Sequence, residues 1–312
     1  MMDKTVKTLA KRQRYSRRIL HNWELYLFLL PAVTVVLVYR YIPMYGVKMA
    51  FQNFVTTKGL DGSDWVGFLQ FEKFFNSYQF NSLIKNTLLI SAYDILAGFP
   101  VAIIFALLLN QMHAKRFKRT LQTVTYMPHF ISTVVMVGML QLFLSPSSGL
   151  YAHLMKATGN APANLLGSAA AFRHIYVWSG IWQHAGWDSI IYIAALSAVD
   201  PSLYEAATVD GANKWHKLIY IDIPSLIPTM VILLILRLGN VMSVGFEKVY
   251  LMQNPLNTPT SEILSTYVYK IGIENNQYSY SAAVDLFNTL VNFTLLVIVN
   301  FISKKVGETS LW

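Results

Sequence analysis

The chain has 312 residues, of which 54% are hydrophobic and 13% charged, whereas soluble domains contain about 25% charged residues. This balance excludes an ordinary soluble core and indicates lipid as the solvent, and the absence of cysteine excludes disulfides, thiolate metal sites and cysteine nucleophiles. The formal net charge of +9 indicates membrane topology rather than nucleic-acid binding, because the basic residues lie beside apolar runs.

Six apolar segments are long enough to cross a bilayer core as helices, which takes about 20 residues each. They lie near residues 25–43, 88–109, 124–144, 175–196, 226–244 and 282–302. A basic leader at residues 1–22 precedes the first segment, and no small-residue cleavage site follows it, so we interpret this segment as an uncleaved signal anchor. The sequence therefore predicts an all-α membrane protein with six transmembrane helices in one domain, residues 23–312.

The distribution of Lys and Arg orients these segments. The leader, the two loops at 110–121 and 198–222 and the tail after 302 together hold 15 Lys and Arg, whereas the longer loops on the other side hold 7. Because basic residues mark the cytoplasmic side, we expect both termini inside. The external loops are aromatic and rich in turn residues, and we expect them to form structured caps.

A polar loop at residues 200–224 interrupts the apolar pattern on the inner side. Asp200-Pro201 is typical of a helix start, with an acidic N-cap and proline at the first position. Asp210-Gly211 predicts the end of that helix, since glycine readily takes the left-handed conformation. Leu203, Ala206 and Ala207 give the helix a small apolar face, which favours docking into a partner's groove over a solvated loop.

The spacing within this loop resembles the EAA loop of the membrane subunits of binding-protein-dependent ABC importers. Glu205-Ala206-Ala207 is followed after three residues by Gly211 and after nine more by Ile221, then by Ile223-Pro224, where isoleucine replaces the usual leucine. The resemblance to carbohydrate permeases, in particular to those for complex or acidic oligosaccharides, continues through YRYIPMYG at 39–46, KNTLLIS at 85–91, FALLLN at 105–110, YMPHFIS at 126–132, GWDSIIYIAAL at 186–196, GFEKVYLM at 245–252 and the terminal SLW.

The resemblance implies a five-helix core made by the second to sixth spans, in a multi-pass protein of the bacterial cytoplasmic membrane. It also implies a second permease subunit in a heterodimer, two copies of an ATPase that bind ATP and Mg, and an extracytoplasmic solute-binding protein that delivers an oligosaccharide. The loop would dock on the ATPase as a coupling helix. The residues expected to make that contact are Glu205, Ala206, Ala207, Asp210, Gly211 and Pro224.

This chain is not expected to be an enzyme or to bind a cofactor itself. It contains no G-x-x-x-x-G-K-[ST] motif, no H-E-x-x-H and no paired carboxylates within a span, and the match of Ser82 and Lys85 to S-x-x-K is interpreted as chance. A membrane-embedded enzyme and an ion-coupled secondary transporter stay as the alternatives. The second usually shows internal repeats, and the sequence shows none.

Charged residues inside spans are candidates for function, because burying them in hydrocarbon costs at least about 2.5–3.5 kcal/mol. Asp188 and Arg237 are the deepest. They are expected either to pair with each other or to line a sugar path, in which Arg237 would bind a substrate carboxylate. The predicted path consists of Trp182, Gln183, Trp187, Asp188, Arg237, Asn240, Asn288 and Asn292. Asp94 and Asp285 receive no role.

Overall fold

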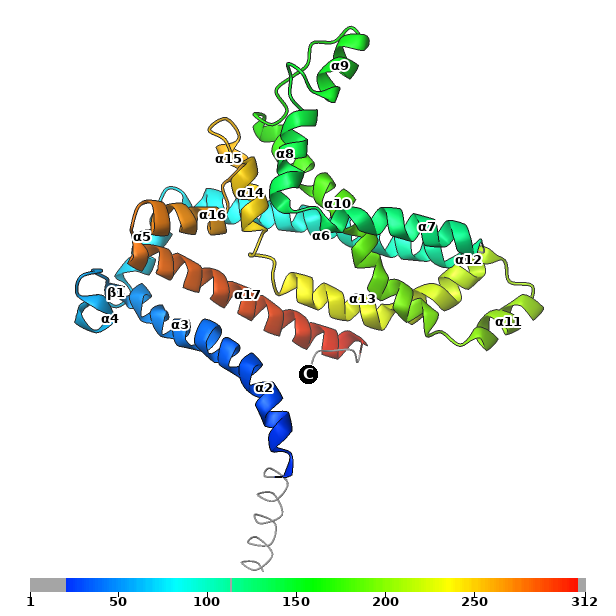
Figure 1. Ribbon diagram of the computed structural model, residues 1–312, viewed down its shortest axis with the longest axis horizontal. Helices are drawn as coiled ribbons and strands as arrows, with labels where there is room; N and C mark the ends of the chain where they lie inside the picture. The colour runs from blue at the N-terminus through cyan, green and yellow to red at the C-terminus, as the bar shows by residue number, and fades with distance from the viewer. Residues whose placement is uncertain (1–20, 113, 308–312) are drawn as a thin grey trace, which may run out of the picture.

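The computed structural model describes residues 21–112 and 114–307. They form a helical bundle from which two arms project (Figure 1). Residues 1–20 of the predicted leader and the terminal Ser310-Leu311-Trp312 lie outside the described residues.

The first arm is one helical segment, Trp23–Phe51. It comprises α2 (Trp23–Val36), the π-helical turn η1 (Leu37–Tyr41), α3 (Ile42–Met44) and the 3-10 helix η2 (Tyr45–Phe51). The π-turn directly precedes Ile42-Pro43, where a wider turn gives the proline ring room beside the carbonyl four residues earlier. No residue of α2 is buried, so its apolar side chains face the surroundings of the chain.

Four long helices build the body of the bundle (Figure 1). They are α6 (Phe80–Asn110), α10 (Ala169–Ser197), α13 (Ile223–Leu238) and α17 (Tyr278–Gly307). Helices α6 and α10 form the most extensive pair, and α13 packs on both α10 and α17. Two strands, β1 (Gln52–Asn53) and β2 (Asp64–Trp65), pair antiparallel with Gln52 opposite Trp65.

Each of the six predicted segments falls mainly on helix. By length and hydropathy alone, four segments of the described chain qualify as membrane spans, namely Trp23–Phe51, Phe80–Asn110, Lys214–Leu238 and Tyr278–Lys305, and a bent pair would make a fifth. Helix α10 has 29 residues, or about 43 Å at 1.5 Å per residue, so it is also long enough to span.

The predicted third span, 124–144, is not one straight helix. Helix α7 (Lys115–Tyr126) and the 3-10 turn η3 (Met127–Phe130) are followed by α8 (Thr133–Phe143) at an angle of 97°. Pro128 lacks an N–H to continue the helix, Ile131 is extended, and the Ser132 side chain accepts a hydrogen bond from the N–H of Val135 as the N-cap of α8. Helix α8 leads into the second arm with α9 (Leu150–Ala157).

The predicted fifth span, 226–244, begins and ends earlier than expected. Helix α12 (Lys214–Lys217) and the π-turn η4 (Leu218–Asp222) run without a break into α13, so that Lys214–Leu238 is continuous. Residues 214–224 of the predicted loop therefore belong to the same continuous helix as the span. The helix stops before Gly239, whose missing Cβ leaves room for Leu296 of α17, and residues 239–245 are not helical.

Two sets of connecting elements lie at opposite ends of the bundle (Figure 1). One end carries β1, β2, α4 (Gly59–Gly62) and α5 (Leu69–Phe75), and the other carries α11 (Pro201–Val209). The segment between α13 and α17 contains α14 (Phe246–Met252), α15 (Thr258–Ser261), α16 (Leu264–Tyr269) and the π-turn η5 (Lys270–Glu274). Loops that alternate between two ends are what a multi-span chain requires.

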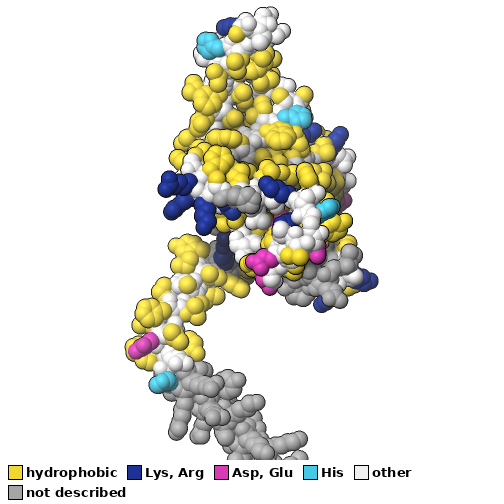
Figure 2. Space-filling view, turned by 90° about the vertical axis from the view of Figure 1, so that its right-hand side faces the viewer, with side chains coloured by type: hydrophobic (Ala, Val, Ile, Leu, Met, Phe, Trp, Pro, Cys, Tyr) yellow, Lys and Arg dark blue, Asp and Glu magenta, His cyan; other side chains and the backbone are white. Residues whose placement is uncertain are grey.

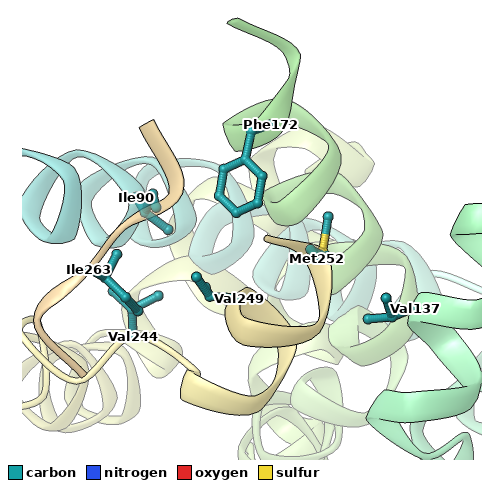
Figure 3. Packing of buried hydrophobic residues seen from close by; sticks show 7 residues of the cluster. All are labelled: Ile90, Val137, Phe172, Val244, Val249, Met252 and Ile263. Atoms are coloured by element: carbon teal, nitrogen blue, oxygen red, sulfur yellow. The ribbon is translucent and has the colours of Figure 1, made fainter. Parts of the chain in front are cut away.

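A hydrophobic cluster joins α14 to the bundle. Phe172 of α10 points into the space between α6 and α14 (Figure 3). The buried members of the cluster are Ile90, Val137, Phe172, Val244, Val249, Met252 and Ile263. The cluster thus anchors the non-helical segment 239–245 against α6, next to the cavity described below.

A glycine at the crossing of α10 with α7 allows the packing of the bundle to be tested. A Cβ on Gly186 of α10 would lie 2.3 Å from the carbonyl oxygen of Thr125, whereas a Cβ on Gly138 of α8 would meet nothing within 4 Å. We expect Gly186→Ala to lower the free energy of unfolding by about 1–3 kcal/mol through overpacking. Gly138→Ala should leave it unchanged or raise it slightly. Thermal unfolding of the purified protein measures both, and equal stability of the two variants would contradict the crossing.

Candidate functional site

A cavity of about 640 Å³ lies between α6, α10 and the segment that follows α13. Its charged and titratable lining residues come from distant parts of the sequence, namely Asp94, Tyr176, His184, Asp188, Arg237, Glu247 and Lys248. Three glycines, Gly98, Gly180 and Gly245, also line it. The backbone of Gly98 lies beside the side chains of Arg237 and Asp94, because a Cβ built there would be 3.7 and 3.8 Å from them, which is ordinary van der Waals contact.

Arg237 lies between two carboxylates in this cavity. Its Nη2 is 2.7 Å from Oδ2 of Asp188, and its Nη1 is 3.9 Å from Oδ2 of Asp94. The guanidinium also lies 5.9 Å from the ring centroid of Phe99. The cluster ties α6, α10 and α13 together, and its side chains are about one-third exposed to the cavity. Two roles were considered for Asp188 and Arg237, an ion pair with each other and contact with the sugar. In this structure the two side chains form the ion pair.

Lys248 is the second cation in the cavity and has a different environment. Its Nζ donates a hydrogen bond of 2.9 Å to the carbonyl of Tyr176 and lies 4.8 Å from that residue's ring centroid. No carboxylate lies within 4.0 Å of it among the residues that the structure describes. Lys248 lies in a predicted external loop, where no sequence pattern indicates that it lines a cavity. Neither Lys248 nor His184 was predicted to lie here.

The predicted sugar path is only partly brought together. Gln183, Asp188, Arg237 and Asn240 line the cavity, and Asp94, which received no role from the sequence, lines it too. Trp182, Trp187, Asn288 and Asn292 do not. Trp182 is 53% exposed outside the cavity, and Trp187 stacks on His129 with ring centroids 4.2 Å apart.

Two of the predicted polar residues bind backbone at helix breaks. Gln183 Nε2 donates to the carbonyl of Ile131, 2.8 Å away, where α7–η3 gives way to α8. Asn292 Oδ1 accepts from the N–H of Met242, 2.9 Å away, and its Nδ2 donates to Ser243, so that it holds the segment after α13. Asn288 is buried on α17. These positions stabilise irregular backbone, which in lipid needs internal partners.

Helix α11 begins and ends as its sequence predicts. Asp200 Oδ1 accepts a hydrogen bond of 2.9 Å from the N–H of Ser202, and Pro201 is the first helical residue. Gly211 has a φ of +73°. Its N–H bonds the carbonyl of Thr208, and the N–H of Ala212 bonds that of Ala207, which is the Schellman arrangement. The EAA sequence and Gly211 therefore form one rigid unit.

Helix α11 stands away from the bundle and exposes its side chains. None of its residues is buried, and Leu203 and Val209 are 50% and 89% exposed. Glu205, Ala206, Asp210 and Pro224 are exposed, and Ala207 is half-buried. Figure 2 views the molecule from this end, where charged side chains gather, while the α2 arm is mainly hydrophobic. Among the described residues, no cluster of His, Asp and Glu is suited to a metal ion.

Comparison with known proteins identifies the class of this architecture. Residues 98–308 match the family described as "Binding-protein-dependent transport system inner membrane component". The chain belongs to this family. It is 39% identical to the polygalacturonan/rhamnogalacturonan transport system permease protein YteP of Bacillus subtilis, with 100% of this chain and 97% of that protein covered. It is 38% identical to Protein LplB of the same organism, with 99% and 98% covered.

A solved structure extends this likeness to the fold. A chain of the bacterial alginate ABC transporter, crystallised in complex with an alginate pentasaccharide-bound periplasmic protein, is 37% identical and superposes with a TM-score of 0.87. The match covers 95% of this chain and 99% of that one.

Family membership establishes the class of function. The chain is a multi-pass inner-membrane permease subunit of a binding-protein-dependent ABC sugar importer, and hence a transport component rather than an enzyme. Such a permease works with a second permease, an ATPase and a solute-binding protein. Both alternatives considered from the sequence, an embedded enzyme and an ion-coupled transporter, are thereby set aside.

The ion cluster generates a testable prediction about stability. Arg237→Ala leaves Asp188 and Asp94 without their cation, and we expect a loss of about 1–3 kcal/mol, typical of polar groups left unpaired. The double variant Arg237→Gln/Asp188→Asn removes both charges and should be more stable than Arg237→Ala. Thermal unfolding of the detergent-purified chain measures this, and a double variant less stable than the single one would rule out a structural pair.

Proposed function

We propose that this chain passes acidic oligosaccharides through an ATP-driven importer in which it pairs with a different permease subunit. Two ATPase copies would bind ATP and Mg, and an extracytoplasmic protein would deliver the sugar. Both termini and α11 would face the cytoplasm. ATP binding acts as a ligand that favours one of two conformations, and α11 would carry the movement to the spans.

The observation that carries the substrate class is the agreement between full-length relatives. The YteP relative is named for polygalacturonan and rhamnogalacturonan, and the solved relative imports the acidic polysaccharide alginate. All three names refer to polymers that contain uronic acids. The substrate of this chain is accordingly proposed to be a fragment of such a polymer.

The cavity suggests which residue meets the substrate carboxylates. Arg237, the candidate from the sequence, already has Asp188 at 2.7 Å and Asp94 at 3.9 Å. Lys248 has a carbonyl and an aromatic ring as partners instead. Ammonium and carboxylate form strong charge-assisted hydrogen bonds, so we assign this contact to Lys248. Gln183 and Asn240, which also belong to the predicted path, are proposed to form hydrogen bonds with sugar hydroxyls.

Uptake by the complete complex in vesicles tests the substrate. Oligogalacturonate should enter in the presence of ATP and the binding protein at least about tenfold faster than its methyl ester, which lacks the charges, a ratio that corresponds to 1.4 kcal/mol. Lys248→Gln should slow uptake of the acid by a similar factor, and Lys248→Arg should retain most of it. Equal uptake of acid and ester would refute the proposed substrate.

Helix α11 has the properties of a docking element. It is exposed along its length, its apolar Leu203 and Val209 face outward, and its end is fixed by the Gly211 turn. We propose that Glu205, Ala206, Ala207, Asp210 and Gly211 contact the ATPase. Pro224, the last residue predicted for the contact, lies in the continuous helix Lys214–Leu238 and would act by shaping that helix.

Substitution of Gly211 tests the docking element. A Cβ there would meet nothing within 4 Å, so the penalty comes from the positive φ and amounts to about 1–2 kcal/mol for ordinary residues. Gly211→Val should reduce ATPase stimulation by the loaded binding protein about tenfold, whereas Gly211→Asn, which tolerates this conformation, should keep it. If Gly211→Val retains full stimulation, the geometry of the turn is not needed for coupling.

A further inference from the structure

A fully buried carboxylate lies where α11 approaches the bundle. Asp222 has no exposed surface and ends the π-turn η4 directly before Ile223-Pro224. A buried carboxylate is costly unless it is hydrogen-bonded. Apolar residues on both sides, Leu218 and Ile223, pack on the cluster formed by α6, α10 and α13.

Three donors from two other segments satisfy this carboxylate. The hydroxyl of Tyr204, in α11, donates to Oδ1 at 2.5 Å, and Nδ2 of Asn110 donates to the same atom at 3.3 Å. Nε2 of Gln111 donates to Oδ2 at 2.9 Å. No Lys or Arg of the described chain lies within 4.0 Å of Asp222. One carboxylate thus joins α11, the last turn of α6 and the start of the α13 helix.

Tyr204 provides the side-chain link between α11 and the bundle. The other side-chain hydrogen bond that leaves α11, among the described residues, runs from Lys217 to Thr208 at 2.7 Å and reaches only the first turn of the continuous helix Lys214–Leu238. Burial and the hydrogen bond to Asp222 raise the pKa of Tyr204 to about 12. The hydroxyl therefore keeps its proton at physiological pH and stays a donor.

The two helices joined at Asp222 also meet at the cavity. Asp94 lies 16 residues before Asn110 on α6, and Arg237 lies 15 residues after Asp222 on the continuous helix to Leu238. At 1.5 Å per residue both distances are about 22–24 Å. Asp94 and Arg237 are 3.9 Å apart. The hydrogen bonds of Tyr204, Asn110 and Gln111 to Asp222, called the latch from here on, therefore lie at one end of this pair of helices. The ion cluster of Arg237 connects the same two helices at the other end.

We infer that Asp222 is a positioning residue that transmits the movement of α11 to α6 and α13 and thereby to the cavity. This inference rests on the docking role proposed for α11. A displacement of α11 moves Tyr204. The carboxylate of Asp222 transmits this movement to α6 and α13 together. Without the bond from Tyr204 to Asp222, the side-chain hydrogen bond that remains between α11 and another element, among the described residues, is the one from Lys217 to Thr208.

The test compares Tyr204→Phe and Asp222→Asn with wild type in the complete complex, reconstituted in vesicles with the binding protein and oligogalacturonate. Tyr204→Phe removes one hydroxyl and leaves the ring in place, and Tyr39→Phe, at an exposed tyrosine of the first arm, is the matched control. We expect Tyr204→Phe to retain the ATPase and its basal hydrolysis, while stimulation by the loaded binding protein and sugar imported per ATP both fall at least threefold. Tyr39→Phe should behave as wild type.

The double variant Tyr204→Phe/Asp222→Asn should be no worse than Asp222→Asn alone, because both changes break the same contact. A latch that is merely structural would lower the unfolding temperature but leave sugar per ATP unchanged, and that result would overturn the inference. If the complex does not assemble with Asp222→Asn, the sugar imported per ATP by Tyr204→Phe alone decides between the two outcomes. Failure of the docking proposal is distinguishable, because Gly211→Val would then keep full stimulation whatever Tyr204→Phe does.

Discussion

The position of Arg237 between Asp188 and Asp94 is the interaction on which the architecture depends. A charge inside a membrane protein has to be paired or face water, and here three charges from three helices achieve both. Here α6, α10 and α13 converge on charged side chains rather than on a fully apolar core, and these side chains line the cavity between the helices. The cavity is thus a consequence of how the spans are held together.

Irregular backbone explains most of the remaining polar residues. The chain breaks at Ile131 and after Leu238, and in lipid each free backbone group needs an internal partner. Gln183 and Asn292 provide these partners, at 2.8 and 2.9 Å. The breaks allow α8 and α14 to pack on each other, and one wall of the cavity is built from residues 240–248, which follow the end of α13.

Hydropathy, charge and local turn chemistry predicted the helical fold, the approximate spans and the ends of α11, because each of these depends on residues close in sequence. The bend at 131–132 was missed, although Pro128 and Ser132 are both recognisable break signals. Half of the residues predicted for the sugar path lie outside the cavity, since composition does not reveal whether an amide such as Asn292 binds a ligand or backbone. Lys248 enters the cavity only through the tertiary packing of α14, so no local pattern could have revealed it.

The polar contacts at both ends of α6 and α13 constrain how these helices can move. At one end Asp222 accepts only neutral donors, whose hydrogen bonds are directional and break over a short distance. At the other end Arg237 interacts with two carboxylates at different distances, 2.7 and 3.9 Å, and charge attraction falls slowly with distance. The end near α11 is consequently held in a defined geometry, while the cavity end can change partners. Movement that enters through α11 is therefore expected to appear as rearrangement at the cavity.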